Sequence, residues 1–207
     1  TERGRDVVSY RIMKTEGRKK RQYLISLEVR YSVVALVAGI IIFSCAIGAI
    51  FVKFALFDRT GNDPIHLFTV RSNILTATAA AFMIPFAVEG IRKKRFVLPR
   101  WIVLLQYMCT LCVVITMLTT LLFILPVKGS SAVTGADFWL HLVSPLCTLA
   151  LFQCVESGIA FTKREMVIVQ IPFWVYMVTY FIKVVIIGKE HGGWSDFYMT
   201  MRFWPAW

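Results

Sequence analysis

Five stretches of apolar residues, each near the length that a helix needs to cross a lipid bilayer, constrain this chain more than any other feature. They cover roughly residues 31–54, 70–91, 101–126, 138–161 and 166–187. A hydrocarbon core about 30 Å thick is crossed by about 20 helical residues. Inside it, the backbone must satisfy its own hydrogen bonds. The pattern predicts an all-α fold, a polytopic transmembrane helical bundle with five visible spans.

The composition agrees with a membrane protein and argues against a soluble domain. The chain of 207 residues is 57% hydrophobic and 14% aromatic, with a mean hydropathy of +0.67. A soluble domain of this length does not use so much apolar surface. The net charge of +11 does not indicate nucleic acid as a partner, because the basic residues border the spans and no recognised binding motif accompanies them. The expected partner is the bilayer.

The basic residues set the expected orientation, because short loops rich in Lys and Arg stay in the cytoplasm. They gather before the first span, between the second and third, and between the fourth and fifth: Arg3, Arg5, Arg11, Lys14, Arg18, Lys19, Lys20, Arg21 and Arg30; Arg92, Lys93, Lys94, Arg95 and Arg100; Lys163 and Arg164. We therefore expect an integral membrane protein with a cytoplasmic N-terminus. Segments 55–69, 127–137 and 188–207 would lie outside.

Three regions are expected along the chain. Residues 1–30 form a basic cytoplasmic N-terminal segment, 31–187 the transmembrane helical bundle, and 188–207 an aromatic extracytoplasmic segment. Because the chain starts at Thr and stops at Trp207, we expect a fragment, with a sixth span following the last residue. The connection at 162–165 is so short that it predicts the fourth and fifth helices to be antiparallel neighbours.

Polar side chains inside three of the spans recur at helical spacing, so each set lies on one face of its helix. The sets are Thr69, Ser72, Asn73 and Thr76; Gln106, Thr110, Met117 and Thr120; Asp137, His141, Ser144 and Thr148. A polar atom that faces lipid lacks a partner, so we expect these faces to point into the bundle. We interpret the hydroxyls of Thr76, Thr110, Thr120 and Thr148 as structural, with hydrogen bonds to a neighbouring helix or to carbonyls of their own helices.

Thr69 and His141 stand out because each opens a span at the same predicted membrane face. An imidazole accepts a proton near neutral pH, and a threonine hydroxyl becomes a nucleophile when a base takes its proton. Asp137, four residues before His141, is placed to orient the ring. The alternative for His141 is a structural role, as a neutral side chain bonded to Asp137 or to a neighbouring helix.

No metal or cofactor is expected. The histidines and two of the acidic residues belong to the predicted outer half: His66, His141, His191, Asp137 and Asp196. Their spacings match no dedicated set of metal ligands.

The segments HLFTVRSNIL at 66–75 and DFWLHLVSPL at 137–146 resemble the two diagnostic segments of the androgen-induced-gene and androgen-dependent TFPI-regulating protein family of integral membrane proteins, in its bacterial-type branch. The family pattern has a threonine at the start of the second helix, and a histidine followed shortly by a proline two helices later. Thr69, His141 and Pro145 match those positions. The resemblance implies six helices and favours a bacterial plasma membrane over a eukaryotic endomembrane.

The resemblance also implies an activity, the intramembrane hydrolysis of lipid esters of the fatty-acid ester type. Thr69 would be the nucleophile and His141 the base, with Ser72, Asn73 or Ser144 as oxyanion donors. The alternative is a non-catalytic membrane transporter or lipid-binding protein, supported by the same polar interior, by Glu156 and by two proline-interrupted spans. Contact between Thr69 and His141 would favour the hydrolase, and a wet path to Glu156 would favour transport.

The predicted orientation is tested by accessibility. In a variant whose native cysteines are replaced by alanine, single cysteines at positions 62 and 94 should react with impermeant reagents from opposite sides of the membrane, because Asn62 and Lys94 flank the second span. Labelling of both positions from one side would overturn the orientation.

Overall fold

The structure, a computed structural model, describes the backbone of residues 2–56, 63–156, 159–198 and 200. It describes the side chains of the same residues except 2–27 and 156. The side chain of Glu156, on which the transport alternative depends, therefore lies outside the described residues. So do residues 57–62 of the predicted outer segment 55–69, and residues 199 and 201–207 of the segment 188–207.

The described chain is built of helices and their connections. The α-helices are α1 Glu2–Ala55, α3 Phe68–Lys93, α4 Arg100–Thr119, α5 Leu125–Lys128, α6 Ala136–Phe138, α7 Ser144–Glu156, α8 Lys163–Ile168 and α9 Ile171–Phe181. Three π-helical turns, in which the helix is wider by one residue, cover Thr120–Ile124, Trp139–Val143 and Ile182–Ile187. Short 3-10 turns cover Pro64–His66, Gly129–Val133 and Lys189–His191.

Five helical segments are long and apolar enough to cross a membrane, the architecture of an integral membrane protein. They are Glu28–Ala55, Phe68–Lys93, Arg100–Val133, Ala136–Val155 and Lys163–Ile187. The predicted all-α bundle with five spans is confirmed. The fourth span differs from the prediction at its end, because α7 stops at Glu156 and the predicted span runs to 161. The first span has no break at residue 30, since α1 is one continuous helix from Glu2.

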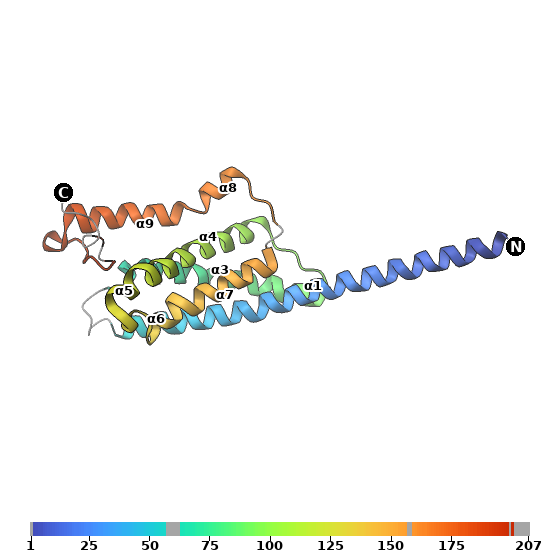
Figure 1. Ribbon diagram of the computed structural model, residues 1–207, viewed down its shortest axis with the longest axis horizontal. Helices are drawn as coiled ribbons and strands as arrows, with labels where there is room; N and C mark the ends of the chain where they lie inside the picture. Colours follow the sequence, from blue (N-terminus) through green and yellow to red (C-terminus); the bar gives the residue numbers. More distant parts are fainter. Residues whose placement is uncertain (1, 57–62, 157–158, 199, 201–207) are drawn as a thin grey trace.

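Four of the spans form a closed ring, in which α1 packs on α3, α3 on α4, α4 on α7, and α7 again on α1 (Figure 1). Apolar side chains fill the middle of this ring: Ala35, Ile42, Ala80, Met83, Ala87 and Leu151 are all buried together. The hydroxyl, amide and imidazole side chains of the polar faces predicted on three spans are buried too, while Met117 and Asp137 are half-buried. The prediction that these faces point into the bundle is confirmed.

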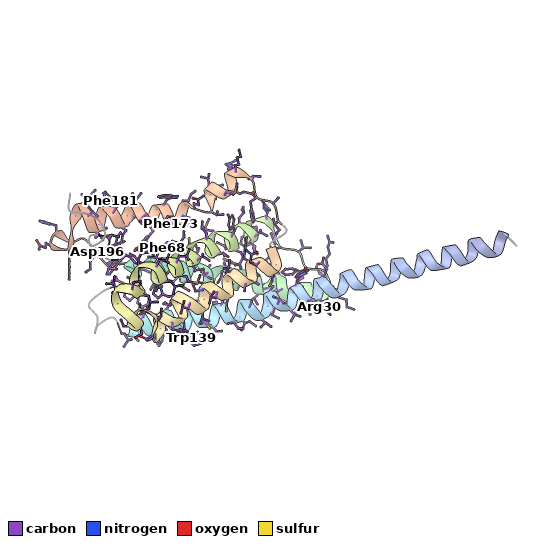
Figure 2. The ribbon with its side chains drawn as sticks, in the orientation of Figure 1. Arg30, Phe68, Trp139, Phe173, Phe181 and Asp196 are labelled. Atoms are coloured by element: carbon purple, nitrogen blue, oxygen red, sulfur yellow. The ribbon has the colours of Figure 1, made fainter. Side chains whose placement is uncertain are left out.

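The fifth span lies outside the ring. Helix α9 contacts α4, and it meets the start of α3, where the ring of Phe68 lies 5.9 Å from that of Phe173 and 4.8 Å from that of Tyr176 (Figure 2). The prediction that the fourth and fifth spans are neighbours is wrong. Thr162 caps a new short helix, α8, and the chain turns again before Pro172, so α9 is carried across to the side of α4.

The two ends of the bundle differ in character. The antiparallel course of the spans brings Arg92–Arg100 and Lys163–Arg164 to one end, called here the basic end (Figure 1). Arg100 fixes this end by bonding both carboxylate oxygens of Glu165, at 2.8 and 2.6 Å, and the carbonyl of Ala160 at 2.9 Å. The opposite end carries all three described π turns and is called here the cavity end.

Gly90 allows α1 and α3 to approach closely near the basic end. A Cβ atom at Gly90 would overlap the hydroxyl of buried Ser32 on α1 and would lie 3.0 Å from the Phe96 ring. At Gly48, a Cβ would meet nothing within 4 Å. The two glycines therefore form a matched pair, one at a close contact and one in open space.

We expect Gly90→Ala to lower the free energy of unfolding by about 1–3 kcal/mol, because an added methyl group in a packed contact forces its neighbours apart. Gly48→Ala, the control, should not lower it. Thermal unfolding of the two purified variants in the same detergent measures the difference. Equal melting temperatures would contradict the close contact at Gly90.

Candidate functional site

Two of the π turns at the cavity end have the same cause. In each, the turn spans five residues and is followed by one more residue and a proline: Thr120–Ile124 precedes Pro126, and Trp139–Val143 precedes Pro145. Proline lacks an amide hydrogen, and its ring crowds the carbonyl one turn earlier. The helix widens before it, and such π turns occur often at functional sites.

The second π turn leaves one backbone carbonyl in need of a donor. The amide of Ser144 donates to the carbonyl of Trp139, five residues earlier. In the same pattern, the carbonyl of Leu140 would accept from the amide of residue 145. Its donor in that ladder would be Pro145, which has no N–H. The buried side-chain amide of Asn73 supplies the hydrogen bond instead, at 3.2 Å, and also bonds the carbonyl of Thr69 at 2.8 Å. Asn73 thereby ties α3 to the start of α7.

Thr120, the first residue of the first π turn, forms a hydrogen bond between two spans. Thr76, Thr110 and Thr148 donate to the carbonyl four residues earlier in their own helices. Thr120 Oγ1 instead lies 2.5 Å from Nδ1 of His141 on the next span, the other arrangement expected for these hydroxyls. Both side chains are nearly inaccessible, with Thr120 1% and His141 8% exposed.

The other ring nitrogen of His141 faces a charged pair. Its Nε2 lies 3.4 Å from Oδ1 of Asp137, and Lys53 of α1 contacts the two carboxylate oxygens at 2.7 and 2.8 Å. Asp137 therefore lies where the sequence placed an orienting carboxylate, but its shorter contacts are to Lys53. The result is a continuous series of polar side chains, from Lys53 through Asp137 and His141 to Thr120.

These side chains border a cavity of about 390 Å³ at the cavity end of the bundle. Thr69, Asp137, His141 and Lys53 line it together with Leu56, Pro64, Leu67, Ile124, Lys128, Ser131, Ala132 and residues Ser195–Tyr198. Thr69 and His141, predicted to meet at one rim, thus share one cavity although they lie on separate spans, far apart in the chain. In the described structure, the hydroxyl bonded to His141 is that of Thr120, not that of Thr69.

Thr69 is fixed through hydrogen bonds that its backbone carbonyl accepts from side chains of the same helix. It is 3% exposed, and its carbonyl accepts hydrogen bonds from Ser72 Oγ at 3.1 Å and from the Asn73 amide. The phenol of Tyr198 lies beside Thr69, and the phenol oxygen accepts from the Phe68 amide at 2.9 Å. Burial raises the pKa of Tyr198 above its ordinary value. The phenol beside Thr69 is therefore neutral.

The three predicted oxyanion donors lie behind the wall of this cavity. Ser72 and Asn73 bond the carbonyl of Thr69 and do not line the cavity, and neither does Ser144. Among the described buried side chains, Asn73 Oδ1 and Ser144 Oγ have no hydrogen-bond partner. The positions of Ser72 and Asn73 fit residues that hold the first turn of α3 in place.

The aromatic segment after α9 folds back over the cavity end. The Trp194 amide bonds the carbonyl of Lys183 in the third π turn at 3.0 Å, and Tyr180 donates to Asp196 at 2.6 Å. Gly193 is required at this crossing, because a Cβ there would overlap the carbonyl oxygens of Lys183 and Gly188. Asp196 lies at the cavity end of the bundle (Figure 2), and residues Ser195–Tyr198 line one side of the cavity.

Three contributors to this site do not stand out in the sequence. The spacing of Thr120 predicts a buried hydroxyl but not its bond to His141, and neither Lys53 nor Tyr198 belongs to a predicted polar face. The WLHLVSP and TLLFILP segments do carry a common signal, a polar residue four to six positions before a proline. That signal marks where a helix is able to widen.

Within the described residues, no group of three or more His, Cys, Asp or Glu side chains is arranged to hold a metal ion. Comparisons with family models, with curated proteins and with solved structures found no match to this chain.

The Lys53–Asp137 pair is tested by a double-mutant cycle. We expect Lys53→Met and Asp137→Asn each to lower stability, and the double variant to lose less than the sum, with a coupling of about 1 kcal/mol or more, because each single change leaves a half-buried group unpaired. The exposed pair Glu89 and Lys93 is the control and should couple less. Additive effects at Lys53 and Asp137 in thermal unfolding would contradict the pairing.

Proposed function

We propose that this protein is an intramembrane hydrolase of lipid esters, of the fatty-acid ester type, in which Thr69 is the nucleophile and His141 the base. The observation that carries the proposal is the shared cavity: a hydroxyl and an imidazole from helices far apart in the sequence border one partly open cavity at the end of an apolar bundle. A pairing of hydroxyl, imidazole and carboxylate is the arrangement that activates alcohol nucleophiles in many hydrolases.

The reaction divides into two steps. The oxygen of Thr69 attacks the ester carbonyl while His141 accepts its proton, and the imidazolium then gives that proton to the departing alkoxide. The product is an acyl ester on Thr69 and a free alcohol. In the second step, water loses a proton to His141 and attacks the acyl ester, which releases the carboxylic acid and restores the threonine.

The environment supports a lipid as the substrate. Apolar side chains form much of the cavity wall, including Leu56, Leu67 and Ile124. The reacting groups lie at the end of spans that themselves match a bilayer core. An ester close to the membrane interface would place its carbonyl near Thr69 with its acyl chain still in apolar surroundings.

The resemblance to the androgen-induced-gene and androgen-dependent TFPI-regulating protein family supports the same assignment at Thr69, His141 and Pro145. With it goes the proposed orientation, in which the basic end is cytoplasmic and the cavity opens to the outer face of a bacterial plasma membrane. The clustering of Lys and Arg at the end opposite the cavity supports that orientation.

The proposal is tested by hydrolysis of a fatty-acid ester by the purified full chain in lipid nanodiscs. We expect Thr69→Ala and His141→Ala each to lower kcat by about 100-fold or more, because the nucleophile and its base act together. The double variant should be no less active than either single one. Thr76→Ala, which removes a hydroxyl bonded to its own helix, is the control and should retain activity.

Full activity of Thr69→Ala would rule out Thr69 as the nucleophile. Absence of hydrolysis by the wild-type chain across a panel of ester lipids, with retained lipid binding, would instead favour the alternative of a non-catalytic lipid-binding protein or transporter.

A further inference from the structure

We propose that Thr120 is a positioning residue for His141: its buried hydroxyl engages Nδ1 and so makes Nε2 the ring atom that exchanges a proton with the cavity. The effect on hydrolysis rests on the proposed function, whereas the effect on the state of the histidine ring does not.

The Thr120 hydroxyl departs from the hydrogen-bond pattern of its helix. Thr110 and Thr116 on α4 both donate to the carbonyl four residues earlier, at 2.8 and 3.0 Å. Thr120 lies one turn further along, where the π turn begins, and its hydroxyl approaches His141 Nδ1 at 2.5 Å. The close approach of these two buried polar atoms identifies them as hydrogen-bond partners.

Thr69 and Thr120, the two threonines near His141, differ in whether their side chains reach the cavity. Thr120 is 1% exposed and does not line the cavity, whereas Thr69 and His141 do. A hydroxyl shielded from the cavity cannot reach an ester carbonyl there. Thr120 therefore acts on the substrate only through the ring of His141, by fixing its rotation and the nitrogen on which it carries its proton.

The charged groups around the other nitrogen point the same way. Nε2 lies 3.4 Å from Asp137, longer than the roughly 2.7–2.9 Å of a charge-assisted hydrogen bond. The carboxylate is occupied by Lys53 at 2.7 and 2.8 Å. A hydroxyl accepts as well as donates, so as part of the proposal we assign the resting proton to Nδ1, donating to Thr120 Oγ1, and the lone pair to Nε2. When Nε2 takes a proton from Thr69, the new imidazolium lies beside the negative charge of Asp137.

The protons balance in this arrangement. One proton leaves Thr69 and arrives at Nε2, while the Nδ1 proton stays on the ring throughout. The same Nε2 proton is later passed to the leaving alkoxide. Thr120 neither gains nor loses a proton, which distinguishes a positioning residue from a nucleophile.

The state of the ring is read by nitrogen-15 NMR of histidine-labelled full chain in lipid nanodiscs, with the His141 signals assigned by their loss in His141→Gln. We expect the neutral ring to be protonated at Nδ1 in the wild type. Thr120→Val, which keeps the side-chain shape and removes the hydroxyl, should shift the proton toward Nε2. Thr120→Ser should restore the wild-type spectrum, and Thr110→Val should leave it unchanged.

Two spectral outcomes would overturn the inference: a wild-type His141 protonated at Nε2, or an identical His141 spectrum in Thr120→Val. In hydrolysis, Thr120→Val should lower kcat by about 10-fold or more at nearly constant KM, with recovery in Thr120→Ser. A lipid-like fluorophosphonate probe found attached to Thr120 rather than Thr69 would also overturn it. If the wild-type chain hydrolyses no ester, the proposed function fails, but the spectra still decide the role of Thr120.

Discussion

The missing amide hydrogen of Pro145 determines how the cavity end of the bundle is organised. Because proline cannot continue the hydrogen-bond ladder, the helix before it widens and the carbonyl of Leu140 is left to another donor. Inside a membrane, no water is present to donate a hydrogen bond to such a carbonyl. Asn73 meets it from α3, and the same amide holds the carbonyl of Thr69. One local constraint thus joins two helices and sets the relative level of Thr69 and His141.

Charge neutralisation supplies the second constraint. Lys53 of α1 and Asp137 of α6 form an ion pair. Both side chains are partly buried, so each charge is stabilised by the opposite charge of its partner. Asp137 lies one turn before His141, so the pair also places a negative charge beside Nε2 of the imidazole. The histidine ring is consequently held on one edge by a neutral hydroxyl and faced on the other by a carboxylate. The two ring nitrogens therefore have different surroundings.

The sequence predicted those features that depend on single residues and their periodicity. Apolar length located the five spans, and helical spacing located the buried polar faces, because both result from burial in lipid. Periodicity also placed Thr120 inside the bundle, but it did not specify His141 as its partner, because a contact between two spans depends on how the helices pack. The contact of Lys53 with Asp137 joins residues 84 positions apart, and local pattern does not specify such pairs. The prediction that α9 packs on the fourth span was wrong, because the break in the helix before Pro172 redirects the chain.

The uneven distribution of π turns has a mechanical consequence. All three described π turns lie at the cavity end, whereas the basic end is fixed by the Arg100–Glu165 contacts and by the close approach at Gly90. Helix ends with a widened, interrupted ladder bend more readily than regular helix. The interruptions at which helices bend are therefore gathered at one end of the bundle, and the tight contacts at the other. In such an arrangement, bending at the cavity end leaves intact the apolar core that holds the spans together.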